Sequence, residues 1–397
     1  MVKKKLIVCI LLIFFSSCLI MIPTIKADAT RMDAMESYIM ECNIGPAWGN
    51  SPDATEPTLL STFQSLYILY TFFNLEGIDS YYLIEWLILC KNRDNGYGII
   101  PYTESLIYYS YYASWIRAIF NQELEYGTQA WILSCQKEES GYGANQNSPA
   151  TLISTFYGLM ALNLYDTSID DENLIIWLKE KQNLIPSSID FGGFSTDGSS
   201  SNLWDAFSAI ASLSILQDFG GVLLSPLIDW IASCQNLNNY HDQYGAFSST
   251  PENTDYSLVN TYAAIACLSI LGSYYLNQIN LDATINWILK LQNEDGGFSN
   301  LYGGGGSSLS STYFAACILD LLDLNVLVSD PVPWDENFIF SLRLTFIICL
   351  IGIFIAINAI IIIKKRRYNR KIQAEREKEK EQFFLNEAEL NKEKLNN

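Results

Sequence analysis

Histidine and basic residues are scarce in this chain. His241 is the one histidine among 397 residues, which excludes a metal site built from several imidazoles. Lysine and arginine number 24 against 43 acidic residues, for a formal net charge of −19. This balance argues against a nucleic-acid partner, because few basic side chains are present to neutralise phosphates. Charged residues make up only 17% and hydrophobic residues 49%, a composition too apolar for intrinsic disorder.

The N-terminal segment has the pattern of a secretory signal. A basic start at residues 3–5 precedes an apolar run, and the small residues Ala27 and Ala29 follow it. Small residues at these two positions are typical of a signal-peptidase site. We therefore expect residues 1–29 to be a signal peptide that is cleaved after Ala29.

A second apolar run lies near the C-terminus. Residues 344–363 contain no charged side chain, and the basic cluster 364–367 follows directly. A helix of this length spans about 30 Å of hydrocarbon, and the basic cluster predicts a cytoplasmic side. The sequence thus predicts a single-pass type I protein of the cell membrane, with residues 331–343 as a juxtamembrane linker. The charged tail 364–397 is interpreted as a solvated extension that is free to meet anionic lipid or a cytoplasmic partner.

The segment between these runs is a repeat. Five tryptophans recur every 45 to 57 residues, and similar phrases begin at three of them: WILSCQ at 131–136, WIASCQ at 230–235 and WILKLQ at 287–292. Trp177 with Gln182 and Trp86 with Lys91 fit the same frame, and Tyr38 begins a weaker first copy. A glycine turn and a segment rich in small and apolar residues follow each phrase. Six units of helix, glycine turn and helix are predicted.

The composition of the two helices in each unit predicts their places. Small residues are frequent in the second helices, expected near 151–164, 203–216, 257–271 and 308–322, and they suit close packing in an inner layer. The helices that carry tryptophan suit an outer layer. One helix pair cannot bury its apolar face alone, so neighbouring units must stack. We expect each aromatic anchor to pack against the glycine turn of its own unit.

The repeat resembles that of protein prenyltransferase β subunits and squalene/terpene cyclases. The copy WILKLQNEDGGF at 287–298 carries the resemblance best, and the match extends over the predicted ectodomain, residues 30–330. The resemblance implies an all-α toroid of about six helix hairpins around a central cavity. The six units are closer to the single ring of the prenyltransferase β subunit than to the two-domain cyclases.

The residues that carry chemistry in that family are missing here. The resemblance implies zinc ligands near residues 255–259 and at Ser311, but neither region supplies the cysteine or histidine. No basic residue lies between Lys181 and Lys290, where the family grips diphosphate. The acidic pair Asp170 and Asp171 also lacks the spacing of the cyclase acid motif. We therefore expect no zinc, no other cofactor and no prenyl transfer.

Six cysteines lie in the predicted ectodomain, and four of them occupy equivalent places in their units. Equivalent positions in neighbouring units are separated by about the 8–10 Å between helix axes, whereas a disulfide needs Cα atoms within about 7 Å. We interpret the cysteines as small core residues. Their even number outside the cell leaves a disulfide framework as the alternative.

Acidic and aromatic residues gather at the expected starts of the inner helices. The candidate cavity residues are Glu56, Glu104, Tyr108, Trp204, Asp205, Asp255, Tyr256 and Tyr302. Such residues can bind a small apolar or glycan ligand, whereas His241 is expected on the surface. None of them is assigned a catalytic role, because acids at helix starts also interact favourably with the helix dipole.

Three functional hypotheses remain. The favoured one is a non-catalytic, membrane-anchored module for ligand binding or scaffolding. The alternatives are an extracellular glycan hydrolase or lyase and a divergent prenyltransferase- or cyclase-like enzyme. Paired carboxylates at the mouth of the cavity favour the glycan enzyme, whereas a dry aromatic funnel favours the prenyltransferase- or cyclase-like enzyme.

Overall fold

The computed structural model describes residues 30–322 except 76 and 170, together with Leu327. The chain divides into one unit of residues 1–332 and another of 333–397, and all of the described residues lie in the first. The predicted signal peptide, linker, transmembrane segment and tail therefore lie outside the described residues. Within the described part, no helix is long and apolar enough to cross a membrane.

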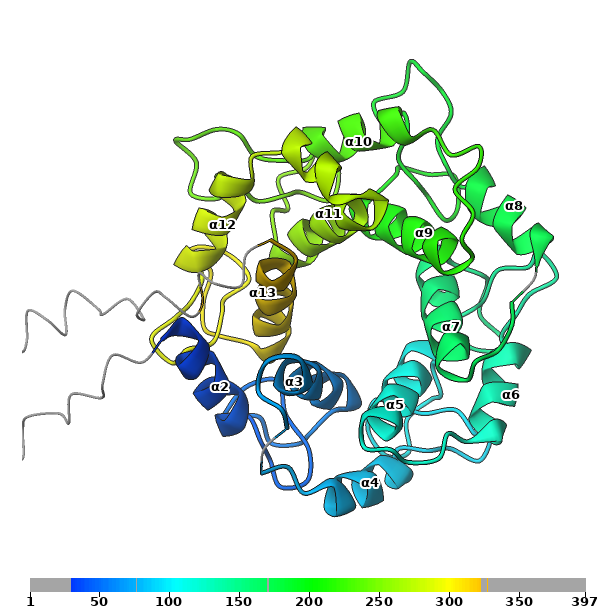
Figure 1. Ribbon diagram of the computed structural model, residues 1–397, viewed down its shortest axis with the longest axis vertical. Helices are drawn as coiled ribbons and strands as arrows, with labels where there is room; N and C mark the ends of the chain where they lie inside the picture. The colour runs from blue at the N-terminus through cyan, green and yellow to red at the C-terminus, as the bar shows by residue number, and fades with distance from the viewer. Residues whose placement is uncertain (1–29, 76, 170, 323–326, 328–397) are drawn as a thin grey trace, which may run out of the picture. The chain divides into compact units, whose positions relative to one another are not determined.

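The described residues form twelve α-helices in two concentric layers (Figure 1). The inner helices are α3 (Leu59–Phe72), α5 (Ile107–Ile119), α7 (Leu152–Leu164), α9 (Leu203–Ile215), α11 (Leu258–Leu271) and α13 (Leu309–Leu322). The outer helices are α2 (Arg31–Glu41), α4 (Ser80–Leu89), α6 (Tyr126–Ser134), α8 (Glu172–Glu180), α10 (Leu224–Ser233) and α12 (Leu281–Lys290). A short 3₁₀ helix, η1 (Ser273–Gln278), leads from α11 to α12.

Each inner helix packs against the next one, and α13 packs back against α3, which closes the ring. Polar residues fix the starts of most inner helices, α5 being the exception, with Leu106 before it. Thr58, Thr151 and Ser257 each accept a hydrogen bond from the third amide of the helix that follows. The expected bounds of the inner helices are confirmed to within one residue at 152–164, 203–215, 258–271 and 309–322.

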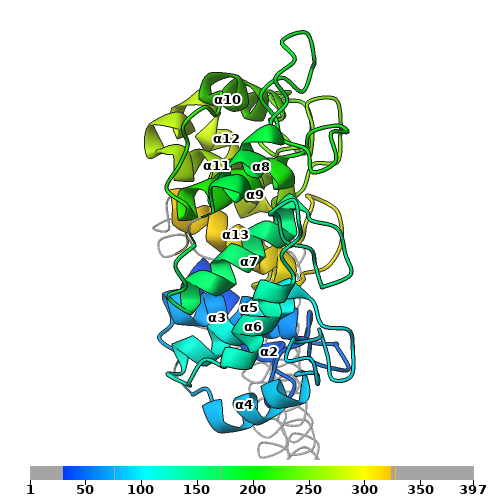
Figure 2. The ribbon, with the colours of Figure 1, turned by 90° about the vertical axis from the view of Figure 1, so that its right-hand side faces the viewer.

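The glycine turns lie on one face of the ring, where the longer connections project in the side view (Figure 2), and they hydrogen-bond to the inner helices of neighbouring units. The first amide of α3 donates to the Ile99 carbonyl of the second turn, and that of α5 donates to Ala144 of the third, both at 2.8 Å. The amide of Leu309 in α13 donates to the Asn50 carbonyl of the first turn, also at 2.8 Å. The bond from α13 to the first turn therefore repeats, at the closing joint, the contact that α3 and α5 make with the turns of the units that follow them.

The aromatic anchors lie on the outer helices and are buried, as the repeat predicts. The expectation that each packs on the glycine turn of its own unit is wrong. A Cβ placed on Gly141 would lie 2.7 Å from Trp177 of the next unit, and one on Gly297 would lie 2.8 Å from Tyr38 of the first. Each anchor therefore occupies the joint between two units, where a side chain on the turn would exclude it.

The six described cysteines are buried and free. Cys42, Cys90, Cys135 and Cys234 each cap the C-terminus of an outer helix. These residues form part of the core, and their interpretation as small core residues is confirmed.

Candidate functional site

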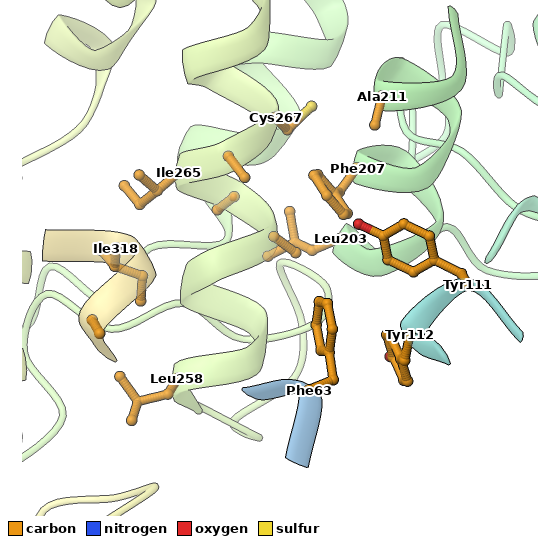
Figure 3. Close-up of a cluster of buried hydrophobic side chains, with 14 of the residues drawn as sticks. Phe63, Tyr111, Tyr112, Leu203, Phe207, Ala211, Leu258, Ile265, Cys267 and Ile318 are labelled. Atoms are coloured by element: carbon orange, nitrogen blue, oxygen red, sulfur yellow. The ribbon is translucent and has the colours of Figure 1, made fainter. Parts of the chain in front are cut away.

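Aromatic side chains from all six inner helices form a continuous circuit at the centre of the ring. Neighbouring ring centroids lie 4.3 to 6.1 Å apart along Phe63, Tyr112, Tyr157, Phe156, Phe207, Tyr262, Phe314, Tyr313 and back to Phe63. Figure 3 shows part of this arrangement, in which Phe63, Tyr112 and Phe207 come from three different helices. We call these eight residues the aromatic circuit.

The tyrosines of the aromatic circuit are neutral hydrogen-bonding groups. Tyr112 is buried, and its hydroxyl donates to the hydroxyl of Tyr157 at 3.1 Å. Burial raises the pKa of Tyr112, Tyr262 and Tyr313 well above the ordinary value of 10.0. These side chains therefore carry no charge at neutral pH.

Basic side chains are nearly absent from the inner helices. Arg117, in the last turn of α5, is the one lysine or arginine in α3, α5, α7, α9, α11 and α13. Its Nη1 lies 3.5 Å from the carboxylate of Glu125, and its Nε donates to the Glu123 carbonyl at 3.0 Å. The guanidinium is thus bound to the start of an outer helix, α6.

Two of the predicted site residues contact the aromatic circuit. The ring of Tyr108 lies 5.8 Å from Tyr157, and that of Trp204 lies 5.3 Å from Phe207 and 6.1 Å from Phe314. None of the eight residues of the aromatic circuit was in the predicted site. The run Tyr108-Tyr109-Ser110-Tyr111-Tyr112 was the available signal, because aromatic residues on both faces of an inner helix must include some that face the centre.

The buried carboxylate of Asp205 binds within the protein. Asp205 is 7% exposed, and its two oxygens accept hydrogen bonds from the amide and the hydroxyl of Thr196 at 2.9 and 3.2 Å. The same hydroxyl accepts from the Leu152 amide, the first of α7. Burial raises the pKa of Asp205 above the ordinary 3.8, although the bonds from Thr196 oppose this effect. Asp205 therefore holds a joint between units.

The other predicted acids are exposed and come from separate units. Glu56 precedes α3, Glu104 precedes α5 and Asp255 precedes α11. Glu104 accepts from the Asn145 side chain at 2.6 Å, and Asp255 accepts from the Ser249 amide at 2.9 Å. The structure gives these two carboxylates local partners in the connections.

The last two candidates lie on the same projecting connections. The ring of Tyr256 is half-buried and meets the exposed His241 edge-on, with centroids 5.5 Å apart. Tyr302 is 47% exposed, and its carbonyl accepts from the side chain of Gln243 at 3.2 Å. Both residues therefore belong to the rim, whereas Tyr108 and Trp204 belong to the centre.

The region where the resemblance implied zinc ligands contains serines with structural roles. Ser257 caps α11, and the Ser311 amide donates to the hydroxyl of Ser308 at 3.1 Å. Among the described residues, no three His, Cys, Asp or Glu side chains are grouped so that they could hold a metal ion.

Comparison with known proteins identifies the family of this ring. The sequence matches the prenyltransferase α/α toroid domain over residues 3–195 and 192–336. The chain belongs to the prenyltransferase toroid family. Its inner and outer helices are the two layers of that toroid, which the repeat phrase predicted.

Solved structures show the same fold at low sequence identity. The protein geranylgeranyltransferase-I of Candida albicans, complexed with GGPP, is 19% identical, and the match covers 65% of this chain and 89% of that one with a TM-score of 0.50. A protein from Actinoplanes is 12% identical, with 76% and 99% covered and a TM-score of 0.52. The type II terpene cyclase MstE from Scytonema is 12% identical, with 75% and 97% covered and a TM-score of 0.49. At these identities the likeness concerns the fold of the prenyltransferase toroid alone.

Proposed function

We propose that this prenyltransferase toroid is a non-catalytic binding module, held at the outer face of a membrane by the predicted segment 344–363. Its ligand is an uncharged, largely apolar molecule that lies against the aromatic circuit. The observation that carries the proposal is the chemistry of this centre, where aromatic rings and neutral tyrosines meet and the inner helices hold one basic residue. Such surfaces bind apolar ligands and use a few hydroxyl groups to orient them.

The same centre is poorly suited to diphosphate chemistry. A diphosphate leaving group is stabilised by cations that are positioned before the reaction, and each of them is worth orders of magnitude in rate. Arg117 is bound to Glu125, and the other described basic residues lie on outer helices or turns. A ligand without phosphate therefore fits this centre better than a prenyl diphosphate.

A cyclase-like enzyme is the second candidate, because the aromatic circuit suits a ligand of isoprenoid type. Such an enzyme also needs an acid that points at its substrate. Asp205 is a buried carboxyl close to Trp204, but both of its oxygens accept hydrogen bonds from Thr196. A glycan hydrolase has less support, since Glu104 and Asp255 precede different inner helices and bind neighbouring loops.

Calorimetry with farnesol and farnesyl diphosphate on the purified full-length chain tests the proposal. We expect farnesol to bind at least tenfold more tightly than the diphosphate, and Trp204→Ala to weaken it by at least tenfold. The matched control is Tyr274→Ala on η1, whose side chain is 70% exposed. A preference for the diphosphate, or one zinc per chain by metal analysis, would support the enzyme instead.

The predicted orientation has its own test. Protease added to intact cells should digest the toroid and leave residues 364–397 protected, because the basic cluster 364–367 predicts a cytoplasmic tail. Digestion of the tail with a protected toroid would reverse the proposed topology.

A further inference from the structure

Long polar side chains bridge most of the joints between neighbouring outer helices. Each one begins at the end of an outer helix and reaches the start of the next. Lys91 pairs with Glu125, the residue before α6, and Gln136 donates to Asp171, the residue before α8, at 2.9 Å. Three further glutamines continue the pattern at 2.9 to 3.1 Å: Gln182 to Leu223, Gln235 to Asn280, and Gln292 to Arg31.

The joint between α2 and α4 lacks such a bridge. Asn43 occupies the place of the glutamines, and its side chain is one methylene group shorter. Within the described residues, its side chain makes no hydrogen bond to Asp79, the residue before α4. The turn itself is shorter, because Asn43 pairs with Trp48 five residues later, whereas Lys91 pairs with Tyr97 six residues later. A Cβ on Gly45 would have no neighbour within 4 Å, whereas one on Gly192 would lie 2.3 Å from the next outer helix.

A groove of about 610 Å³ opens at this unbridged joint. Asn43 and Asp79 lie in its wall together with Tyr82, Glu85 and Trp86, and Met40 and Leu89 extend its apolar lining. Among the described residues that line the groove, two are carboxylates and none is a lysine or arginine. The Asp79 side chain caps α4 through one oxygen, at 3.0 Å from the Tyr81 amide, and that leaves its second oxygen for another donor.

We propose that this groove binds a lysine or arginine side chain of a partner protein, flanked by apolar residues. The basic group would donate to Asp79 and take the place of the missing bridge, as Lys91 does with Glu125 at the next joint. Charge complementarity supports this occupant, because Asp79 and Glu85 attract a cation. Tyr82, 62% exposed, offers a ring face for cation–π contact, and Met40 and Leu89 contact the flanking apolar residues.

Fluorescence anisotropy on the purified full-length chain tests the proposal. The probe is a fluorescein-labelled nine-residue peptide of glycine and serine with Leu-Lys-Leu at its centre, compared with the same peptide carrying Leu-Gln-Leu or Leu-Glu-Leu. We expect the lysine peptide to bind at least fivefold more tightly than either, and less tightly at high salt. Equal binding of all three peptides, or no binding, would overturn the proposal.

Two variants locate the peptide in the groove. Asp79→Asn removes the charge and keeps a good helix cap, and it should weaken the lysine peptide at least fivefold. Asn43→Lys supplies the bridge from within the chain, so it should abolish peptide binding and raise the urea midpoint of unfolding. The matched control is Asp229→Asn, because Asp229 precedes Trp230 as Glu85 precedes Trp86, at a joint that Gln182 already bridges. Unchanged binding in both groove variants, or equal loss in the control, would show that the groove does not bind the lysine.

Discussion

The contact between Gly141 and Trp177 predicts an energetic coupling across a joint. The tryptophan is 8% exposed, and a Cβ on Gly141 would lie 2.7 and 2.8 Å from two of its ring atoms. We expect Trp177→Ala to cost about 3–5 kcal/mol of unfolding free energy through the cavity it leaves. Gly141→Ala should cost about 1–3 kcal/mol by overpacking, because buried neighbours cannot move away freely.

The double substitution should cost about 1–2 kcal/mol less than the sum of the two single ones. Removing the indole relieves most of the overpacking, although the Ala150 Cβ stays 2.9 Å from the new methyl group. The matched control pairs Gly141→Ala with Trp131→Ala. Trp131 is the anchor of the unit that contains Gly141, and its ring lies against Gly96 of the preceding unit. This control pair should be additive within about 0.5 kcal/mol.

Each cycle compares the parent protein, the two single variants and the double variant by urea unfolding, monitored by circular dichroism. If the m-values of the four proteins agree, the differences in unfolding free energy give the coupling energy of each pair. The reasoning is refuted if the Trp177 pair is additive while the Trp131 pair is coupled. Each anchor would then pack against the turn of its own unit.

Three further predictions concern the stability of the protein at low pH, the reactivity of two buried thiols and the closure of the ring. Burial alone would raise the pKa of Glu125, but the hydrogen bond from Lys91 and the charges of Lys91 and Arg117 lower it below its ordinary 4.5. The stability that Glu125 contributes is therefore present above pH 4.5 and is lost as the pH falls through its lowered pKa. We expect Glu125→Gln to cost about 1 kcal/mol of unfolding free energy at pH 7 and nothing at low pH. Urea midpoints measured across that pH range check this. Burial raises the pKa of Cys90 and Cys135 to about 12. After iodoacetamide treatment, peptide mass spectrometry should therefore find both cysteines unmodified in the native chain and alkylated in urea. Rapid labelling of the native chain would contradict their burial. Gln292→Ala removes hydrogen bonds to Arg31 and Gly296 and should cost about 1–2 kcal/mol of unfolding free energy. Hydrogen exchange in this variant should be faster in α2 than in α8. Equal exchange in the two helices would argue against a role of Gln292 in closing the ring.

The fold could be predicted because its signals are local. A tryptophan, a glutamine five residues later and a glycine turn mark four of the six helix pairs, and the spacing of small residues marks the inner helices. The choice of packing partner is not local. The same phrase is compatible with packing of Trp177 on the turn of its own unit or on that of its neighbour, and only the stacking of units decides this.

The candidate site was predicted less well than the fold. Trp204 and Tyr108 were found, but Asp205 looked like an exposed acid at a helix start because its bonds from Thr196 cannot be read from spacing. The groove beside α4 did have a sequence signal, since Asn43 replaces glutamine and the turn that follows is one residue short. A residue that departs from the repeat, as Asn43 does, indicates a site only once the role of the glutamine at the same place in the other units is known.

Closure of the ring has a consequence for synthesis of the chain. Gln292 bonds to Arg31 across a sequence separation of 261 residues, and α13 must reach α3 before the circle is complete. A chain made from its N-terminus therefore presents α2 and α3 without their final partners until nearly the whole toroid has emerged. During that interval the buried faces of Met35 and Phe63 are open to water and to other chains. The first unit thus keeps its apolar surface exposed for longest during synthesis, and ring closure is the step that covers it.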